Sequence, residues 1–202
     1  MPKYIAFINT ETNGLHKHSK FNVTIKNLDL WARLVKLQYH IGYRDEKSGK
    51  FILTKKVDKL IKPHHFLIDE NVSKINNITT KKAEKKGENI IDVLNEFKTD
   101  IKNVSVIVSH NLEFHLKTLQ AEMLRWVIVV NFNNYILIDT INFFHQLEYP
   151  KLKILSKHIL NKKYKNKSRK YNIVIIRKIF FKLYEMFEKQ VKEQKKCTKK
   201  ID

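Results

Sequence analysis

An apolar run that passes directly into polar residues opens the chain and most constrains its fold. Residues 3–8 are typical of a buried β-strand, and the turn after them carries the amide of Asn9 and the carboxylate of Glu11. Because side chains alternate along a strand, these two groups are expected on one face. Such a pair at the end of a central strand is where a metal-dependent phosphodiesterase would place its first ligands. Asn9, however, cannot carry a charge.

Strand-like segments come first in the chain, and helices alternating with strands follow them. Residues 31–43 and 51–61 predict an antiparallel meander with the first strand. The order predicts an α/β fold, with three antiparallel strands, then shorter parallel strands, in a mixed sheet flanked by helices. The later segments are predicted helices at residues 80–86, 88–101, 112–125, 139–147, 152–160 and 171–191, and predicted strands at residues 104–108 and 135–138.

Composition bounds the number of domains and the kind of partner. The 202 residues, 43% of them hydrophobic, predict one domain over residues 1–191 and a basic, disordered tail over residues 192–202. The single cysteine, Cys197, excludes an intrachain disulfide and favours a reducing compartment. No apolar run reaches the roughly 20 residues that span a bilayer, so we expect a soluble, intracellular protein without a membrane partner.

The formal net charge of +20 predicts attraction to a polyanion, of which nucleic acid is the commonest. A second interpretation stays open. Nearly all the cations are lysine, and lysine, isoleucine and asparagine are abundant together, as an AT-rich genome would produce without selection for binding.

Several segments together resemble one enzyme family. Residues 7–15, containing Asn-Thr-Glu-Thr-Asn-Gly, resemble the first signature of the DnaQ-like (DEDDh) 3′–5′ exonucleases, Asp-x-Glu-Thr-x-Gly. Residues 108–115, containing His-Asn-Leu-Glu-Phe-His, resemble the second, His-Asn-x-x-Phe-Asp. Residues 75–79 and 138–140 resemble a His-Gly-Ile-Thr stretch and an Asp-Thr pair of the same family. The similarity extends from about residue 4 to residue 188 in the family's order, and it implies the ribonuclease H-like fold.

The resemblance implies removal of nucleotides from a 3′ end by two divalent metals, four carboxylates and a general-base histidine. The carboxylate positions fall on Asn9, Glu11, His115 and Ile176, and the histidine position falls on Tyr171. One ligand of four remains, isoleucine cannot ligate a metal, and tyrosine is a poor general base near neutral pH. We therefore predict a degenerate, catalytically inactive site that needs no cofactor.

A sharper alternative is a transition-metal site built from Glu11 and His115 with His110, since imidazole and carboxylate suit zinc or manganese. In the competing interpretation, which we favour, His110 caps and packs at a strand end while His115 fills the space of a lost site.

A basic segment just before the third signature borders the ancestral substrate cleft, according to the resemblance. Its cations would suit phosphate contacts, and the neighbouring tyrosines would suit base stacking. A solvated loop is the equal alternative. The predicted nucleic-acid-binding residues are Lys162, Lys163, Lys165, Lys167, Arg169 and Lys170.

The function hypotheses come from three classes. The favoured one is an inactive exonuclease-like protein that binds DNA or RNA, or serves as a structural subunit of a nucleic-acid-associated assembly. The second is an active 3′–5′ exonuclease with a rewired Mg²⁺ or Mn²⁺ site. The third is a protein-interaction platform without nucleic-acid contact. The residue bias and the polar loop after the first signature also resemble exonuclease-like proteins of large DNA viruses, which implies the cytoplasm of a host cell.

Overall fold

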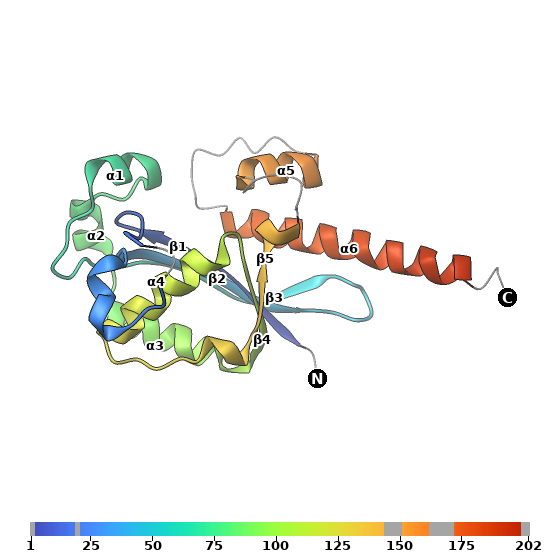
Figure 1. The fold of residues 1–202 in the computed structure, drawn as a ribbon, viewed down its shortest axis with the longest axis horizontal. Coiled ribbons are helices and arrows are strands. Elements are labelled where there is room, and N and C mark those ends of the chain that lie inside the picture. The colour runs from blue at the N-terminus through green and yellow to red at the C-terminus, as the bar shows by residue number, and fades with distance from the viewer. Residues whose placement is uncertain (1–2, 19–20, 144–150, 162–171, 199–202) are drawn as a thin grey trace. The chain divides into compact units, whose positions relative to one another are not determined.

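The computed structural model describes residues 3–18, 21–143, 151–161 and 172–198 (Figure 1). The chain divides into two compact units, Met1–Asp139 and Thr140–Asp202. The sequence predicts one domain over residues 1–191 and contains no Pro- or Gly-rich linker that marks a boundary at Asp139.

The first unit is built on a five-stranded mixed sheet with the strand order β3-β2-β1-β4-β5. β1 pairs antiparallel with β2, and β2 with β3, whereas β4 is parallel to both β1 and β5. This confirms the predicted α/β fold with its antiparallel meander and shorter parallel strands. The strands are β1 (Tyr4–Thr12), β2 (Leu34–Arg44), β3 (Phe51–Leu60), β4 (Val104–Ser109) and β5 (Ile136–Asp139).

The helices of the first unit begin at residues with clear capping signals. Thr79 accepts a hydrogen bond from the backbone N–H of Lys82, and Asn89 accepts one from Ile91. The α-helices of the first unit are α1 (Glu70–Asn76), α2 (Thr80–Lys86), α3 (Ile90–Asp100) and α4 (Leu112–Arg125), and its short 3₁₀ turns are η1 (Ile25–Leu30), η2 (Ile101–Asn103) and η3 (Phe132–Asn134).

Both faces of β1 are buried, as expected for the central strand of a sheet covered on both sides. The face that carries Ile8 and Thr10 packs against α3 and α4. There Tyr39, the neighbour of Ile8 on β2, contacts Phe97 of α3 edge-on, with ring centroids 5.2 Å apart. The opposite face carries Phe7, Asn9 and Glu11.

In the second unit, η4 (Thr140–Phe143), α5 (Leu152–Leu160) and α6 (Asn172–Thr198) are the described elements. α6 buries Ile173, Ile176 and Phe180 at helical spacing, and α5 buries Leu155. Among the residues that the structure describes, no helix is both long enough and apolar enough to cross a bilayer.

The structure adds α1, which is not predicted from the sequence, and it differs from the predictions at several element ends. β2 begins at Leu34 rather than at residue 31. β1 continues through Thr12, so Asn9 and Glu11 lie inside the strand rather than in a turn, because pairing with β2 extends to Leu34. The helix predicted for residues 139–147 is described only as far as η4. α6 includes residues 192–198, predicted as disordered tail, because that stretch is rich in the helix formers Lys, Glu and Gln and lacks Gly and Pro.

Candidate functional site

The candidate site lies at the carboxyl end of β1, where the sheet opens. Pairing between β1 and β4 ends at Phe7 and Val108, and Ser109 then donates a hydrogen bond from its hydroxyl to the carbonyl of Ile8, 2.7 Å away. Beyond this point β1 is paired only with β2. The edge of β1 that pairs with β4 up to Phe7 can therefore contact side chains from the start of α4. Many α/β ligand sites lie at such a strand end.

Asn9 belongs to a row of polar side chains that crosses three strands. In the strand register Asn9 lies opposite Gln38, and Gln38 lies opposite Asp58. The Asn9 amide donates to Gln38 Oε1 at 3.3 Å, and the Gln38 amide donates to Asp58 Oδ2 at 3.1 Å. The ammonium of Lys36 completes the row through an ion pair with Asp58, with Nζ 2.7 Å from Oδ1. The Asn9 amide is therefore already engaged within the sheet.

Glu11 is buried, with 5% of its surface exposed, and it lies opposite Lys36 of β2 in the register. Its position two residues after Asn9 in a regular strand places both side chains on one face. The same face carries Lys36, Gln38 and Asp58. Sequence reasoning missed these three residues, although the alternation in residues 34–44 sets Lys36 and Gln38 on one side of a strand.

His115 on α4 is bonded to β1 at Thr10. Its Nδ1 atom lies 3.1 Å from the backbone nitrogen of Thr10 and 2.8 Å from the Thr10 hydroxyl. A backbone N–H can only donate, so Nδ1 must accept, and the proton on Nε2 is donated to the carbonyl of His110 at 3.1 Å. Burial lowers the pKa of His115 to about 4, so the ring is neutral at pH 7. Thr10 points away from the face that carries Asn9 and Glu11.

The start of α4 is capped from a distant strand. Asp139, the last residue of β5, accepts hydrogen bonds from the backbone nitrogens of Asn111 and Leu112 at 2.9 and 2.7 Å. The sequence predicts a helix that begins at residue 139, whereas Asp139 is the last residue of β5 and its carboxylate caps α4. Asn111, the residue before α4, has a left-handed backbone with φ of 65° and forms no side-chain cap of its own.

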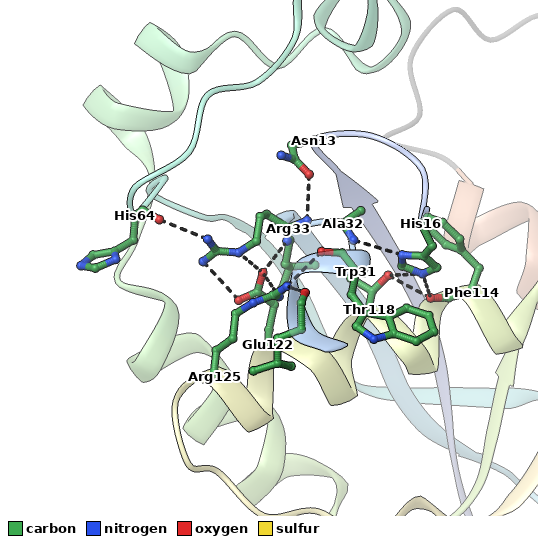
Figure 2. Close-up of polar contacts among 12 residues, drawn as sticks. Asn13, His16, Trp31, Ala32, Arg33, His64, Phe114, Thr118, Glu122 and Arg125 are labelled. Carbon is green, nitrogen blue, oxygen red and sulfur yellow. Dashed lines mark hydrogen bonds and ion pairs between the residues drawn. The ribbon is translucent and has the colours of Figure 1, made fainter. Parts of the chain in front are cut away.

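The connection between β1 and β2 is attached to α4 by a half-buried histidine (Figure 2). His16 accepts from the backbone N–H of Ala32 through Nδ1 at 3.2 Å, and its Nε2 lies 3.2 Å from the carbonyl of Phe114. Its ring stacks on that of Phe114, with centroids 4.3 Å apart. Burial lowers the pKa of His16, which keeps the ring in the neutral form that these contacts require.

A buried carboxylate holds the same connection at a second point, which we call the Glu122 clamp. Glu122 has no exposed side-chain surface and accepts hydrogen bonds from Arg33 Nε at 2.7 Å and from the backbone of Leu34 at 3.0 Å (Figure 2). It also forms an ion pair with Arg125, whose Nη1 lies 3.0 Å from Oε1. Arg33 also donates to the carbonyl of His64. Sequence reasoning missed this clamp. The feature that could have indicated it is Glu122 itself, an acidic residue on the otherwise apolar face of α4.

The remaining predicted site residues lie outside the described residues, in the second unit or at the end of β4. Tyr171 and the basic segment at residues 162–170 lie outside the described residues. Ile176 is buried in α6 of the second unit, with 1% of its surface exposed. His110 is half-buried at the end of β4, and its carbonyl bonds to His115.

The family is given by a comparison of the sequence with family models. The model RNase_T, described as "Exonuclease", matches residues 46–178, more than half of the chain. The chain belongs to this exonuclease family. The match begins after β2, so Asn9 and Glu11 lie outside the matched residues of this exonuclease-family chain.

Solved exonuclease structures share the fold. Exonuclease I of E. coli in complex with a dT13 oligonucleotide superposes with a TM-score of 0.69 at 14% identity, covering 95% of this chain and 43% of that one. Exonuclease I from Methylocaldum szegediense gives 0.67 at 12% identity, covering 91% and 40%. The chain thus spans about two fifths of the length of these exonucleases. A search of curated protein sequences found no significant match.

Divalent metals are the cofactors that the family resemblance implies, and a zinc-bound form of the E. coli exonuclease I complex with single-stranded DNA is among the similar structures. The described residues here do not fit a two-metal site. Glu11 is the one carboxylate at the matched positions, Asn9 carries no charge to offset a dication, and the His115 Nδ1 lone pair is occupied by Thr10. Nor do the described residues contain a group of three or more His, Cys, Asp or Glu side chains arranged to hold a metal.

Proposed function

We propose that this exonuclease-family protein binds nucleic acid, or serves as a structural subunit of a nucleic-acid-associated assembly, and does not hydrolyse nucleic acid by the two-metal mechanism. The observation that carries the proposal is the bonding of His115. The residue at the second aspartate position is neutral, fully buried and bonded at both ring nitrogens.

The energetics of the His115 contacts support this role. If His115 turned to ligate a metal, the buried N–H of Thr10 would lose its acceptor, at an expected cost of about 1–3 kcal/mol. The residue opposite Glu11 in the register is Lys36, whose ammonium is paired with Asp58 at 2.7 Å and has no lone pair to offer a metal. Both observations disfavour the two cations that the family resemblance implies.

Nucleic-acid binding is supported by charge and by the family. The net charge is +20, and the similar E. coli exonuclease I structures contain oligonucleotides. The predicted contacts at Lys162, Lys163, Lys165, Lys167, Arg169 and Lys170 remain part of this proposal. Such binding would weaken steeply as salt is added, because it releases counterions from the phosphates.

The experiment that tests the proposal follows a 3′-labelled single-stranded oligonucleotide in Mg²⁺ and, separately, in Mn²⁺. We expect no shortening by the wild-type protein or by Glu11→Gln, while E. coli exonuclease I shortens the same substrate in parallel. We also expect both forms to bind the oligonucleotide equally at low salt. Shortening by the wild type that Glu11→Gln abolishes would establish an active exonuclease with a rewired site, and the proposal would be wrong.

A further inference from the structure

A second basic surface lies on α2, away from the segment that the sequence predicts to bind nucleic acid. Four of the seven residues of α2 are lysines, and all four are exposed, whereas Ala83 is fully buried on the inner side of the helix. At about 100° per residue, Lys81 and Lys85 point away from Ala83, and Lys82 and Lys86 follow on one side of Lys85, with Lys86 the nearest of the four to the Ala83 side. We call Lys81, Lys82, Lys85 and Lys86 the lysine face.

The lysine face gathers on one short helix four lysines without an acidic partner among the described residues, whereas the first unit's other exposed lysines of this kind, such as Lys47 and Lys98, are scattered. Lys36, Lys55 and Lys59 each form an ion pair with a carboxylate at 2.6–2.7 Å. Among the described residues none of the four lysine-face ammonium groups does so, and the nearest acid on the same helix, Glu84, forms no ion pair with them. Lys82 Nζ donates to the carbonyl of Asn77 at 3.0 Å, which leaves its charge uncompensated.

The stability of α2 does not account for the first two lysines. Thr79 is the N-cap, so Lys81 and Lys82 lie in the first turn, where the helix dipole disfavours positive charge and where α2 has no acidic residue. Lys82 also occupies the third helical position, at which a capping box would have Glu or Gln. Lys85 and Lys86 in the last turn do suit the dipole. Two of the four lysines thus lie where they lower the local stability of the helix.

The backbone beneath the lysine face is firmly held. Ala83 and Ile78 belong to a small core with Val35 and Ile68. At the end of α2, a Cβ on Gly87 would come within 2.3 Å of the Ala83 carbonyl and 2.4 Å of the Lys62 nitrogen, so only glycine permits this close approach.

The segment after α2 continues the attachment to the sheet. Glu88 donates to the carbonyl of Leu60 at 2.8 Å and accepts from the backbone of Lys62 at 2.9 Å. Figure 1 shows α2 as a short helix at the periphery of the first unit. The four ammonium groups are therefore presented from a fixed scaffold, which lowers the ordering cost of binding a chain of phosphates.

We propose that the lysine face binds the phosphodiester backbone of single-stranded nucleic acid. The inference rests on the proposed function, because nucleic acid is chosen over other polyanions on the strength of that role. It adds a contact surface outside residues 162–170. No aromatic side chain belongs to α2, so the contacts are to phosphates and the binding is independent of base sequence.

The test compares two variants with the same net charge by fluorescence anisotropy of a 5′-labelled dT20 at several salt concentrations. One variant replaces the four lysines of the lysine face with Gln. The control carries Lys47→Gln, Lys50→Gln, Lys98→Gln and Lys102→Gln, four exposed lysines that form no ion pair among the described residues.

We expect the lysine-face variant to bind at least tenfold more weakly than the control at low salt. A plot of log affinity against log salt concentration should be less steep for the lysine-face variant than for the wild type, by about 3. Each lost phosphate contact lowers the slope by about 0.7 for a single strand, and four contacts are removed. Equal weakening of the two variants, or no weakening of either, would overturn the inference and leave the proposed function standing. Failure of the wild type to bind dT20 would overturn both. Displacement of dT20 by polyglutamate at equal charge would show a general polyanion site and overturn the assignment to nucleic acid.

A second measurement separates binding from structure. The double variant Lys81→Glu, Lys82→Glu places acids in the first turn of α2, so its melting temperature should rise while its affinity for dT20 falls. A purely structural role for these lysines predicts instead that the melting temperature falls and the affinity is unchanged.

Discussion

His115 shows how one residue changes the end of a central strand. The ring accepts from Thr10 across 105 positions of sequence and donates to the carbonyl of His110. Pairing of β1 with β4 ends at Phe7, so no carbonyl of β4 accepts from the Thr10 N–H. The His115 ring supplies that acceptor instead. A charged ring could not accept at Nδ1, so this contact depends on the protonation state of one imidazole.

That dependence predicts a loss of stability in mild acid. Burial holds the folded-state pKa of His115 at about 4, below the unfolded value of 6.5, so the unfolded chain takes up a proton first as pH falls. The contribution is fully present above pH 6.5 and is lost as pH falls from 6.5 to 4. The contribution of His115 to the free energy of unfolding is about 3 kcal/mol, from a pKa difference between 6.5 and about 4.

Urea unfolding of the wild type and of His115→Gln between pH 4 and 7.5 would check this prediction. Glutamine can accept and donate in place of the ring but does not titrate, so the stability difference between the two proteins isolates His115. A difference that stays constant over this pH range would contradict the assignment of a neutral, bonded ring.

Val127 is a strained residue just after α4. Its φ is 57°, a left-handed conformation that β-branched residues rarely adopt, and 87% of its surface is exposed. The backbone N–H groups of Val127 and Ile128 donate to the carbonyls of Leu124 and Met123, which is the Schellman pattern that usually has glycine at this position.

Replacing Val127 should therefore stabilise the protein. We expect Val127→Gly to raise the free energy of unfolding by about 1 kcal/mol, because glycine adopts this conformation without a steric penalty. Val127→Ala keeps a Cβ and should gain less. Urea unfolding midpoints would measure both, and a destabilised glycine variant would show that the exposed valine makes a stabilising contact.

At the scale of elements, the Glu122 clamp joins α4 to the connection between β1 and β2. One buried carboxylate faces two guanidinium groups, Arg33 and Arg125. Burial lowers the pKa of Arg125, and the charge of Glu122 acts in the opposite direction. The connection is thus held by an ion pair at one end and by the stacked His16 ring at the other.

Removing only the charge of Glu122 should be strongly destabilising. We expect Glu122→Gln to lower the free energy of unfolding by about 3 kcal/mol, since it leaves two largely buried arginines without their counter-ion. Glu113→Gln on the same helix is the matched control. That carboxylate is 71% exposed in its pair with Lys117, so its loss should cost less than about 1 kcal/mol. Similar unfolding midpoints for the two variants would contradict the clamp.

At the scale of the whole molecule, local patterns predicted the elements of the first unit well, because alternation and helical spacing are properties of neighbouring residues. The bounds of α4 and of the helix between Thr79 and Gly87 agree with prediction, and β1 ends four residues later than predicted. Periodicity within a segment predicts which face is apolar but carries no information about its distant partner.

The contacts of the candidate site could not be predicted for that reason. The bond from His115 to Thr10 and the cap that Asp139 provides for α4 depend on how segments far apart in the sequence meet. The row from Asn9 to Asp58 depends on the register of three strands, which the sequence does not specify. The family resemblance predicted which positions belong to the site, and the structure supplied what each one touches.

The row of side chains across β1, β2 and β3 also bears on how this fold is maintained. An active centre that gathers several carboxylates lowers the stability of its own protein, because like charges must be held together before a cation arrives. Here Asp58 is paired with Lys36, and the amide of Gln38 bonds to both Asp58 and Asn9 of β1. The carboxylate of this row is therefore already compensated within the sheet when the chain folds.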